Sequence, residues 1–380
     1  MMKRILVSLF IGMSLLTLAG CWDTKDIQDI QYITAVGIDY RNGQYDIYVQ
    51  VTSFAGVAKQ ESLEPKPTPV WVAKGSGKTI NAALNDIYKK SNQYVYWAHV
   101  QLIIFSETLL KHGLDQVNDP ILRFQQIRET TWLYGTDDSL EDILIVNSLF
   151  GSSVQTSIFN PEDIYKLRSF VAPIRIQSFY TQNYESGMTV KLPKISLLPE
   201  VWKKQGGSKN TVKLTGSYLI KNNQLKAKIA NKHLTGLRWL TKSTVRSPVA
   251  VKINEDTSVE MSLIRPKFDI KPIFMNDKVV FDISIKVNGV VRDMEGNIPL
   301  PILKDKVENV LAKEIRSTYT FALEKGTDIY NLEETVYRED VKKWKAIFGN
   351  DFTLAEDSIR NIKVDVTIEQ TGDYKYEFLN

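Results

Sequence analysis

Along the first ninety residues, apolar and polar positions alternate first with the period of a β-strand and then with that of a helix. Apolar side chains alternate with more polar ones over 45–52, and Asn42-Gly43 separates this segment from an apolar run over 33–40. Because Asn-Gly supplies the positive φ angles of a tight type I′ turn, the pattern predicts a β-hairpin with one buried face. Residues 80–88 place apolar side chains at helical spacing, which predicts an amphipathic helix.

The next hundred residues mix predicted strands with predicted helices. Residues 95–105 are almost all apolar or aromatic, which predicts a buried strand with Trp97 in the core. Ser106 is expected to cap a short helix that Gly113 ends. Apolar spacing predicts further helices over 115–123, 139–146 and 161–170, and a strand over 130–134. This part of the chain is therefore expected to be mixed α and β.

Beyond residue 202 the pattern changes. Residues 203–211 contain a run, Lys-Lys-Gln-Gly-Gly-Ser-Lys-Asn, without any apolar residue, and this run predicts a linker. Apolar residues at helical spacing over 303–322 predict a long helix, which is followed by a helix over 341–348 and an alternating strand over 362–368. Connections too short for a parallel crossover predict an antiparallel meander, with strands over 212–221, 224–230, 249–253, 258–264, 267–275 and 278–291.

Together these patterns predict a multi-domain α+β protein. The expected parts are a cleaved segment over 1–20, an α/β region with mixed sheets over 21–202, the linker 203–211 and an α+β domain over 212–380. The α/β region has room for two subdomains, and the last domain is an antiparallel sheet covered by the long helix. A chain of 380 residues, of which 43% are hydrophobic, can bury cores of this kind.

The first twenty residues have the layout of an export signal. The basic pair Lys3-Arg4 precedes an uncharged apolar run over 5–18, which is shorter than the about 20 residues of a membrane-spanning helix. Leu18-Ala19-Gly20-Cys21 follows and resembles the lipobox of bacterial lipoproteins. We therefore expect cleavage between Gly20 and Cys21 and a diacylglyceryl thioether on Cys21. An uncleaved anchor, or an ordinary signal with a chance cysteine, is the alternative.

Cysteine and charge content limit the partners of the exported body. Cys21 is the one cysteine in the sequence, so this body must fold without a disulfide. The chain has 48 Lys and Arg against 44 Asp and Glu, and removal of Lys3 and Arg4 leaves 46 against 44, a net charge of +2. Since no block of like charge stands out, we expect no nucleic-acid partner and membrane attachment through the lipid on Cys21 alone.

One glycine-rich segment invites a nucleotide-binding interpretation. Gly75-Ser76-Gly77-Lys78-Thr79 ends like a phosphate-binding loop and lies between a short apolar stretch and a helix. Such a loop needs a glycine five positions before Gly77, however, and that position is Val72. The side chain of a valine would crowd the backbone amides that hold phosphate. A plain strand-turn-helix is therefore the favoured interpretation.

No other segment predicts a catalytic or cofactor site. The three histidines, His99, His112 and His233, lack partners at metal-ligand spacing, and His99 lies in the apolar run over 95–105, which favours a hydrogen-bonded core histidine. Gly151-Ser152-Ser153 is no nucleophile elbow. We expect no enzyme activity, no metal and no cofactor, although a pair of catalytic carboxylates cannot be recognised from one sequence.

A series of short motifs runs along almost the whole chain, from Cys21-Trp22-Asp23 onwards. It continues through Val36-Gly37-Ile38-Asp39, Gly77-Lys78-Thr79-Ile80, Ala83-Leu84, His99 and Glu107 to Asp328-Ile329, Trp344, Phe352 and Thr371-Gly372. In this order the motifs resemble the C-subunit lipoproteins of bacterial spore-germination nutrient receptors, the Ger(x)C family. Ala98 departs from the family pattern, in which a serine often precedes the histidine.

The resemblance implies a three-domain α+β protein on the outer surface of the spore inner membrane. It also implies two multi-spanning receptor subunits as partners and a role in the response to amino acids or sugars. A docking and assembly role agrees with the anchored, disulfide-free body that the residues predict. One competing hypothesis is a solute-binding lipoprotein that holds a nutrient in a cleft between its two halves. An extracytoplasmic hydrolase is a third.

Overall fold

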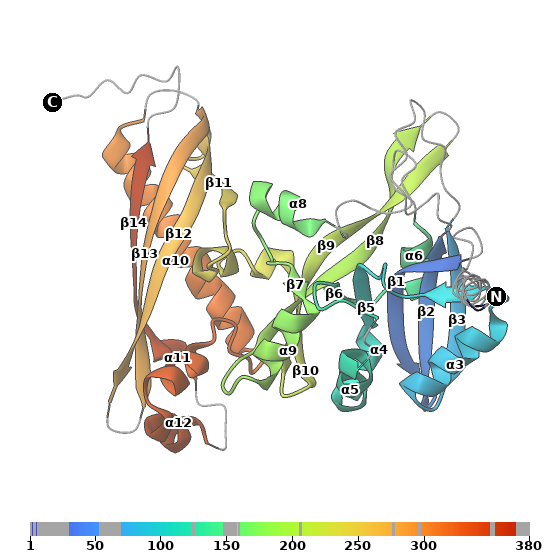
Figure 1. Cartoon of the computed structure of the whole chain (residues 1–380). Coiled ribbons are helices and arrows are strands. Elements are labelled where there is room, and N and C mark those ends of the chain that lie inside the picture. Colours follow the sequence, from blue (N-terminus) through green and yellow to red (C-terminus); the bar gives the residue numbers. More distant parts are fainter. Residues whose placement is uncertain are drawn as a thin grey trace.

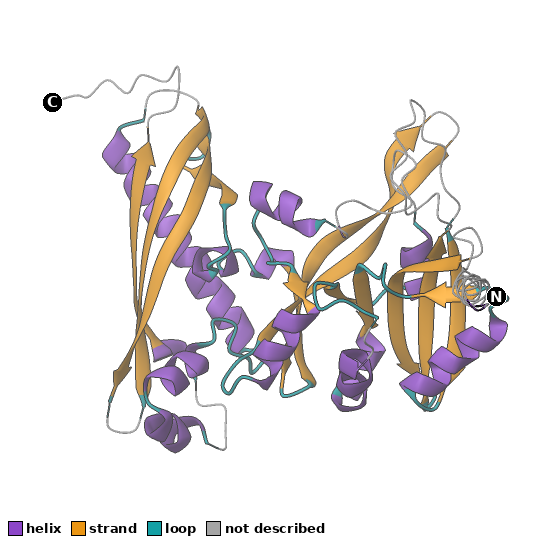
Figure 2. Cartoon of the chain, viewed as in Figure 1, coloured by secondary structure: helices purple, strands orange, loops and turns teal. Residues whose placement is uncertain are grey.

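The computed structural model of the chain describes residues 30–52, 70–123, 126–146, 158, 160–204, 207–275, 278–294, 298–349 and 354–369, together with residues 2 and 5. The strands of this part of the chain form two sheets (Figures 1 and 2). The larger sheet and its helices make up the N-terminal half, and the smaller sheet with a long helix makes up the C-terminal half. The α+β class is thus confirmed.

The larger sheet begins with the predicted hairpin. Its first elements are β1 (Ile30–Arg41), β2 (Gln44–Thr52), β3 (Trp71–Gly77) and α3 (Ile80–Lys90). β1 and β2 pair antiparallel, and Asn42 and Gly43 between them have φ angles of 53° and 75°, so the type I′ turn is confirmed. β3 adds antiparallel to β2, and α3 packs on β2 and β3.

The middle of the larger sheet is parallel. It consists of β4 (Tyr94–Tyr96), β5 (Leu102–Ser106), α4 (Glu107–His112), α5 (Asp115–Arg123), β6 (Trp132–Thr136), α6 (Leu140–Ile145) and α8 (Pro161–Leu167). β4 and β5 both pair parallel with β1, and β6 pairs parallel with β5. The predicted cap is confirmed, because the Ser106 side chain accepts from the Leu109 amide and Gly113 follows α4 with a φ of 104°.

The single strand predicted over 95–105 is wrong. Ile30 pairs with Tyr94 and Ala35 with Leu102, so a step of five residues along β1 is matched by eight on its partner. The extra residues form a turn in which the Val100 amide donates to the Trp97 carbonyl at 3.0 Å. Trp97 is nonetheless 1% exposed, so its predicted place in the core is confirmed.

The far end of the larger sheet contains strands that the sequence does not assign to the N-terminal half. The elements are β7 (Ile174–Arg175), α9 (Ile176–Tyr184), β8 (Val190–Lys204), β9 (Gly207–Lys221) and β10 (Gln224–Ala230). The main order across the sheet is β10-β9-β8-β6-β5-β1-β2-β3, with β4 beside β1 and β7 beside β6. β9 and β10 therefore belong to the N-terminal half and not to the C-terminal meander.

The structure has a β-hairpin where the sequence predicts the linker 203–211. β8 and β9 pair as far as Lys203 with Ser208 and Lys204 with Gly207. Val201, Trp202 and Lys203 are exposed, and Figure 1 shows this end of the hairpin projecting beyond the sheet. A two-stranded ribbon in solvent needs no apolar face, and its composition therefore cannot be told from that of a linker.

The smaller sheet is mixed, whereas the sequence predicts an antiparallel one. Its elements are β11 (Arg246–Lys252), β12 (Ser258–Phe274), β13 (Val279–Met294), α10 (Leu300–Leu323), α11 (Leu332–Glu339), α12 (Val341–Phe348) and β14 (Ile359–Glu369). β11, β12 and β13 pair antiparallel, but β14 lies parallel to β13 because the three helices form a crossover connection. The strands predicted over 258–264 and 267–275 are one strand with a register shift between Ile264 and Lys267.

The predicted long helix packs on this sheet and faces the N-terminal half. Leu303, Val307, Leu311 and Ile315 of α10 are fully buried, as the helical spacing predicts, and α10 lies between the two sheets in Figure 1. The 3₁₀ helices η2 (Asn231–His233), η3 (Leu237–Leu240) and η4 (Glu356–Ser358) complete the described elements. The connection from β10 through η2 and η3 leads the chain from one half into the other.

The hydrophobic cores show how the halves are joined. Tyr218 and Ile220 of β9 belong to the core of the larger sheet, whereas Leu219 between them belongs to the core of the smaller sheet. Alternate side chains of a strand point to opposite faces, so β9 supplies both cores. Ile229 of β10 also lies in the C-terminal core. The two halves therefore share apolar packing at this strand pair.

Candidate functional site

The predicted lipid-attachment site lies outside the described residues. This holds for Cys21, for the cleavage position at Gly20 and also for Gly151-Ser152-Ser153. Among the described residues no helix is long and apolar enough to cross a membrane. The attachment of the body therefore stays a prediction from the sequence.

The glycine-rich segment is a strand-turn-helix, as predicted. A Cβ atom on Gly75 would lie 2.3 Å from the Ala83 carbonyl oxygen, and one on Gly77 would lie 2.5 Å from the Ala83 amide nitrogen. Thr79 then caps α3 by accepting from the Ala82 amide at 3.1 Å. The two glycines thus allow β3 and α3 to approach closely, which explains the sequence without a phosphate ligand.

The histidines pack against aromatic rings of the body. His99 lies in the turn between β4 and β5 and is half-buried, with its ring 5.3 Å from that of Tyr32, so the predicted core position is wrong. Burial, with the nearby Arg128, lowers the pKa of His99. His112 stacks on Tyr40 and His233 on Phe321, with ring centroids 3.6 Å and 3.7 Å apart. In the described parts of the chain no His, Cys, Asp and Glu side chains gather in a group that could hold a metal ion.

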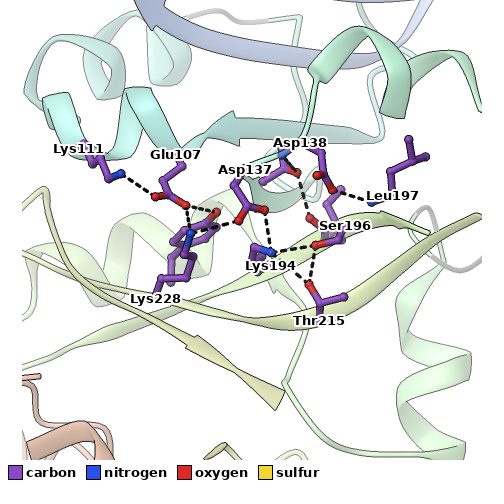
Figure 3. Close-up of polar contacts among 12 residues, drawn as sticks. Glu107, Lys111, Asp137, Asp138, Lys194, Ser196, Leu197, Thr215 and Lys228 are labelled. Carbon is purple, nitrogen blue, oxygen red and sulfur yellow. Dashed lines mark hydrogen bonds and ion pairs between the residues drawn. The ribbon is translucent and has the colours of Figure 1, made fainter. Parts of the chain in front are cut away.

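The main cluster of charges joins α4 and the loop after β6 to the strands β8 and β10 (Figure 3). We call Glu107, Asp137, Lys194 and Lys228 the charged junction. The Lys228 ammonium lies 2.5 Å from a Glu107 carboxylate oxygen and 3.1 Å from Asp137, and the Lys194 ammonium lies 2.7 Å from Asp137. Lys111 adds an ion pair to Glu107 at 2.7 Å. The charges thus alternate in sign through five side chains from one end of the cluster to the other.

The electrostatics of the charged junction keep both carboxylates ionised. Burial raises the pKa of Glu107 and Asp137, but hydrogen bonds from lysines outweigh burial and hold both pKa values below the ordinary range. The Tyr218 hydroxyl also donates to Glu107 at 3.2 Å, and burial raises the pKa of this tyrosine. A general acid needs a raised pKa, so these carboxylates have the character of structural ion pairs.

A second polar cluster connects the two halves of the molecule at the start of α11. The Asp328 carboxylate is 1% exposed and accepts from the amides of Tyr330 and Glu333 at 3.2 and 2.8 Å. Burial raises the pKa of Asp328. Three contacts then cross between the halves: the Thr189 amide donates to the Asn331 side chain at 3.1 Å, Lys221 pairs with Glu333, and Arg338 lies 3.6 Å from Glu185.

A cleft lies beside this polar connection. It has a volume of about 700 Å³ and is lined by the N-terminal half, including Met188 and Lys191, and by the C-terminal half, including Leu240, Phe268 and Asn331. The position corresponds to the cleft that the solute-binding hypothesis expects between two halves. No local sequence pattern marks Lys191, because its neighbours in the cleft come from distant segments.

The fold and these clusters define a class of protein. It is a two-part α+β body whose main charge cluster consists of ion pairs between separate elements of the fold. Two family models match the chain: "Spore germination protein N-terminal domain" over residues 23–197 and "Spore germination B3/ GerAC like, C-terminal" over residues 215–372. The chain therefore belongs to this family of spore germination proteins, and the resemblance found in its motifs is confirmed.

Individual relatives agree with this family. The chain is 24% identical to "Spore germination protein B3" of Bacillus subtilis (strain 168), over 88% of this chain and 90% of that protein. It is 22% identical to "Spore germination protein KC" of the same organism, over 98% and 97%. The structure titled "Crystal Structure of the GerBC protein" matches with a TM-score of 0.55 at 17% identity, over 88% of this chain and 97% of that one, and this likeness shows the fold.

Several residues of the sequence motifs now have a structural explanation. Asp39 is 1% exposed, accepts from Ser106 and Thr108, and pairs with Arg41 at 2.6 Å. Glu107 takes part in the charged junction, and Asp328 stabilises the start of α11. Sequence reasoning assigned no role to the lysines of the charged junction, because their acidic partners lie far away along the chain.

Proposed function

We propose that this chain is the lipid-anchored C subunit of a spore-germination nutrient receptor. In this role it stands on the outer face of the spore inner membrane and docks beside two multi-spanning subunits. The observation that carries the proposal is the family match, which begins at residue 23, two positions after the predicted lipobox cysteine Cys21. Membership of the germination family supports the receptor role, and the lipobox supports the anchor.

The position of β1 limits how far the body can stand from the membrane. Ile30, where β1 begins, lies nine positions after Cys21. Fully extended, nine residues span at most about 30 Å. With a lipid on Cys21, the start of β1 would therefore lie within this distance of the lipid surface. Confinement near a membrane raises the effective concentration of the body for partners in the same membrane.

The anchor is tested by the substitution Cys21→Ala in the spore-forming host. We expect the protein to leave the membrane fraction and nutrient-triggered germination to fall with it, since several lipid chains supply the attachment. Thr24→Ala serves as the control, because it lies beside the lipobox and leaves the lipid-bearing thiol in place. Full membrane retention of Cys21→Ala would contradict the anchor.

The partners are tested by purification of the tagged chain from detergent-solubilised spore membranes. Mass spectrometry is expected to identify two multi-spanning proteins that copurify with the chain in constant ratio. The same purification from Cys21→Ala spores, after equal expression, provides the control for nonspecific capture. Copurification of transporter components alone would contradict the receptor role and support a solute-binding lipoprotein.

A further inference from the structure

The cleft between the two halves has the size of a small-molecule site. Its volume of about 700 Å³ falls within the range of about 300–1,000 Å³ that such sites occupy. One wall comes from α9 and the start of β8, and the other comes from η3, β12 and α11. Because both halves supply walls, a molecule in the cleft contacts residues that are more than a hundred positions apart in the sequence.

Lys191 is directed away from the core of the N-terminal half. Its neighbours on β8, Val190 and Leu192, are fully buried in that core, and alternation along a strand sends Lys191 to the opposite face. This face is the one that looks towards the C-terminal half, and Lys191 lines the cleft there while half-buried itself.

The ammonium of Lys191 has no hydrogen bond or ion pair within the described part of the chain. Asp328 and Glu334 act on it only through their charge at longer range. Both acids already have partners: Asp328 accepts from two backbone amides, and Glu334 pairs with Arg338. Burial lowers the pKa of Lys191 to about 8. The lysine is therefore still largely protonated at neutral pH.

A half-buried cation without a partner is a costly arrangement unless an anion satisfies it. The lining of the cleft also includes the apolar side chains of Leu240, Phe268 and Ile270, which are partly buried. A short apolar group can pack on these walls while a carboxylate reaches the ammonium. The polar side chain of Asn331 also lines the cleft.

We infer that the cleft binds a small carboxylate ligand with a short apolar group, and that the ammonium of Lys191 receives the carboxylate. Only the biological meaning of this site depends on the receptor role proposed above. The binding itself is a property of the single chain and can be measured without partners or a membrane. Failure of the anchor experiment and failure of this one are thus separate results.

Titration calorimetry on the full chain in detergent tests the site with a matched pair of probes. Propionate is expected to give saturable heat, whereas propionamide, which has the same shape without the charge, gives none. Lys191→Met should weaken propionate binding by about tenfold or more, since a charge-assisted contact contributes at least that factor. Lys191→Arg keeps the charge and should retain binding. Lys203→Met, at an exposed position of the same strand, is the control and should bind like the unchanged chain.

Chemical protection of the unchanged chain gives a second readout that does not depend on a variant folding. Lys191 is acetylated with an amine-reactive ester at pH 8, and its peptide is quantified by mass spectrometry. Propionate is expected to slow acetylation of Lys191 and not of Lys203, and propionamide to slow neither. Equal propionate binding by Lys191→Met, or binding of inorganic phosphate in place of propionate, would overturn the proposal.

Discussion

Two lysines on the same strand, Lys194 and Lys191, have opposite surroundings. Lys194 lies in the charged junction, where its ammonium meets Asp137 at 2.7 Å and Ser196 at 2.8 Å. Lys191 lies in the cleft, where the described residues offer its ammonium no such contact. Buried polar groups that fold with their partners stabilise the fold, whereas a group left without one remains available to a ligand. Sequence alone does not separate the two, since both are lysines in one strand.

The largest expected effect concerns a close backbone contact between the two halves, at Gly187. Gly187 has a φ of 75°, and a Cβ atom there would lie 2.9 Å from the Glu334 amide nitrogen. Gly187→Ala should therefore lower the free energy of unfolding by about 2 kcal/mol, because positive φ and close backbone approach both disfavour a side chain. Urea unfolding monitored by circular dichroism measures this. Gly43→Ala, which has the same φ but open space, separates the two causes.

Lys194→Met tests how much the charged junction contributes to stability. The substitution keeps most of the side-chain length but leaves Asp137 without one of its two lysines. We expect a loss of about 1–2 kcal/mol in the free energy of unfolding, since the lysine side chain is only 13% exposed. Lys203→Met is the control and should change it by less than about 0.5 kcal/mol. Coinciding unfolding curves for the two variants would show that the junction does not stabilise the fold.

Acid should weaken the charged junction. The folded-state pKa values of Glu107 and Asp137 are lowered, so their stabilisation is complete above the ordinary carboxyl pKa of about 4 and is lost as the pH falls through the lower folded values. The urea midpoint should therefore fall between pH 5 and pH 3. The double variant Glu107→Gln, Asp137→Asn should show a smaller fall over the same range. An equal fall in both proteins would assign the acid sensitivity to other carboxyls.

The smallest expected effect on stability belongs to Lys191→Met. Because this ammonium makes no contact that folding must preserve among the described residues and its burial is unfavourable, the free energy of unfolding should not fall, and any rise should be less than about 0.5 kcal/mol. Propionate binding should nevertheless weaken by about tenfold or more. A loss of stability as large as that of Lys194→Met would show that the two lysines have the same role.

Local patterns predicted the elements whose causes are local. The Asn42-Gly43 turn, the Ser106 cap and the apolar spacing of α10 each depend on a few neighbouring residues, and all three are present in the structure. The parallel pairing of β14 and the break between β4 and β5 depend on pairing with β13 and β1, which no local pattern contains. The cleft is the extreme case, because its walls come from both halves.

The hairpin of β8 and β9 has a consequence for how this protein can change over generations. The seam between the two family models falls between residues 197 and 215, inside this hairpin, so the first model ends within β8 and the second begins within β9. A recombination event at the seam would pair β8 of one family member with β9 of another. It would also alter β9, which supplies side chains to both cores. We therefore expect an exchange between family members to preserve the fold only when β8 and β9 come from the same parent.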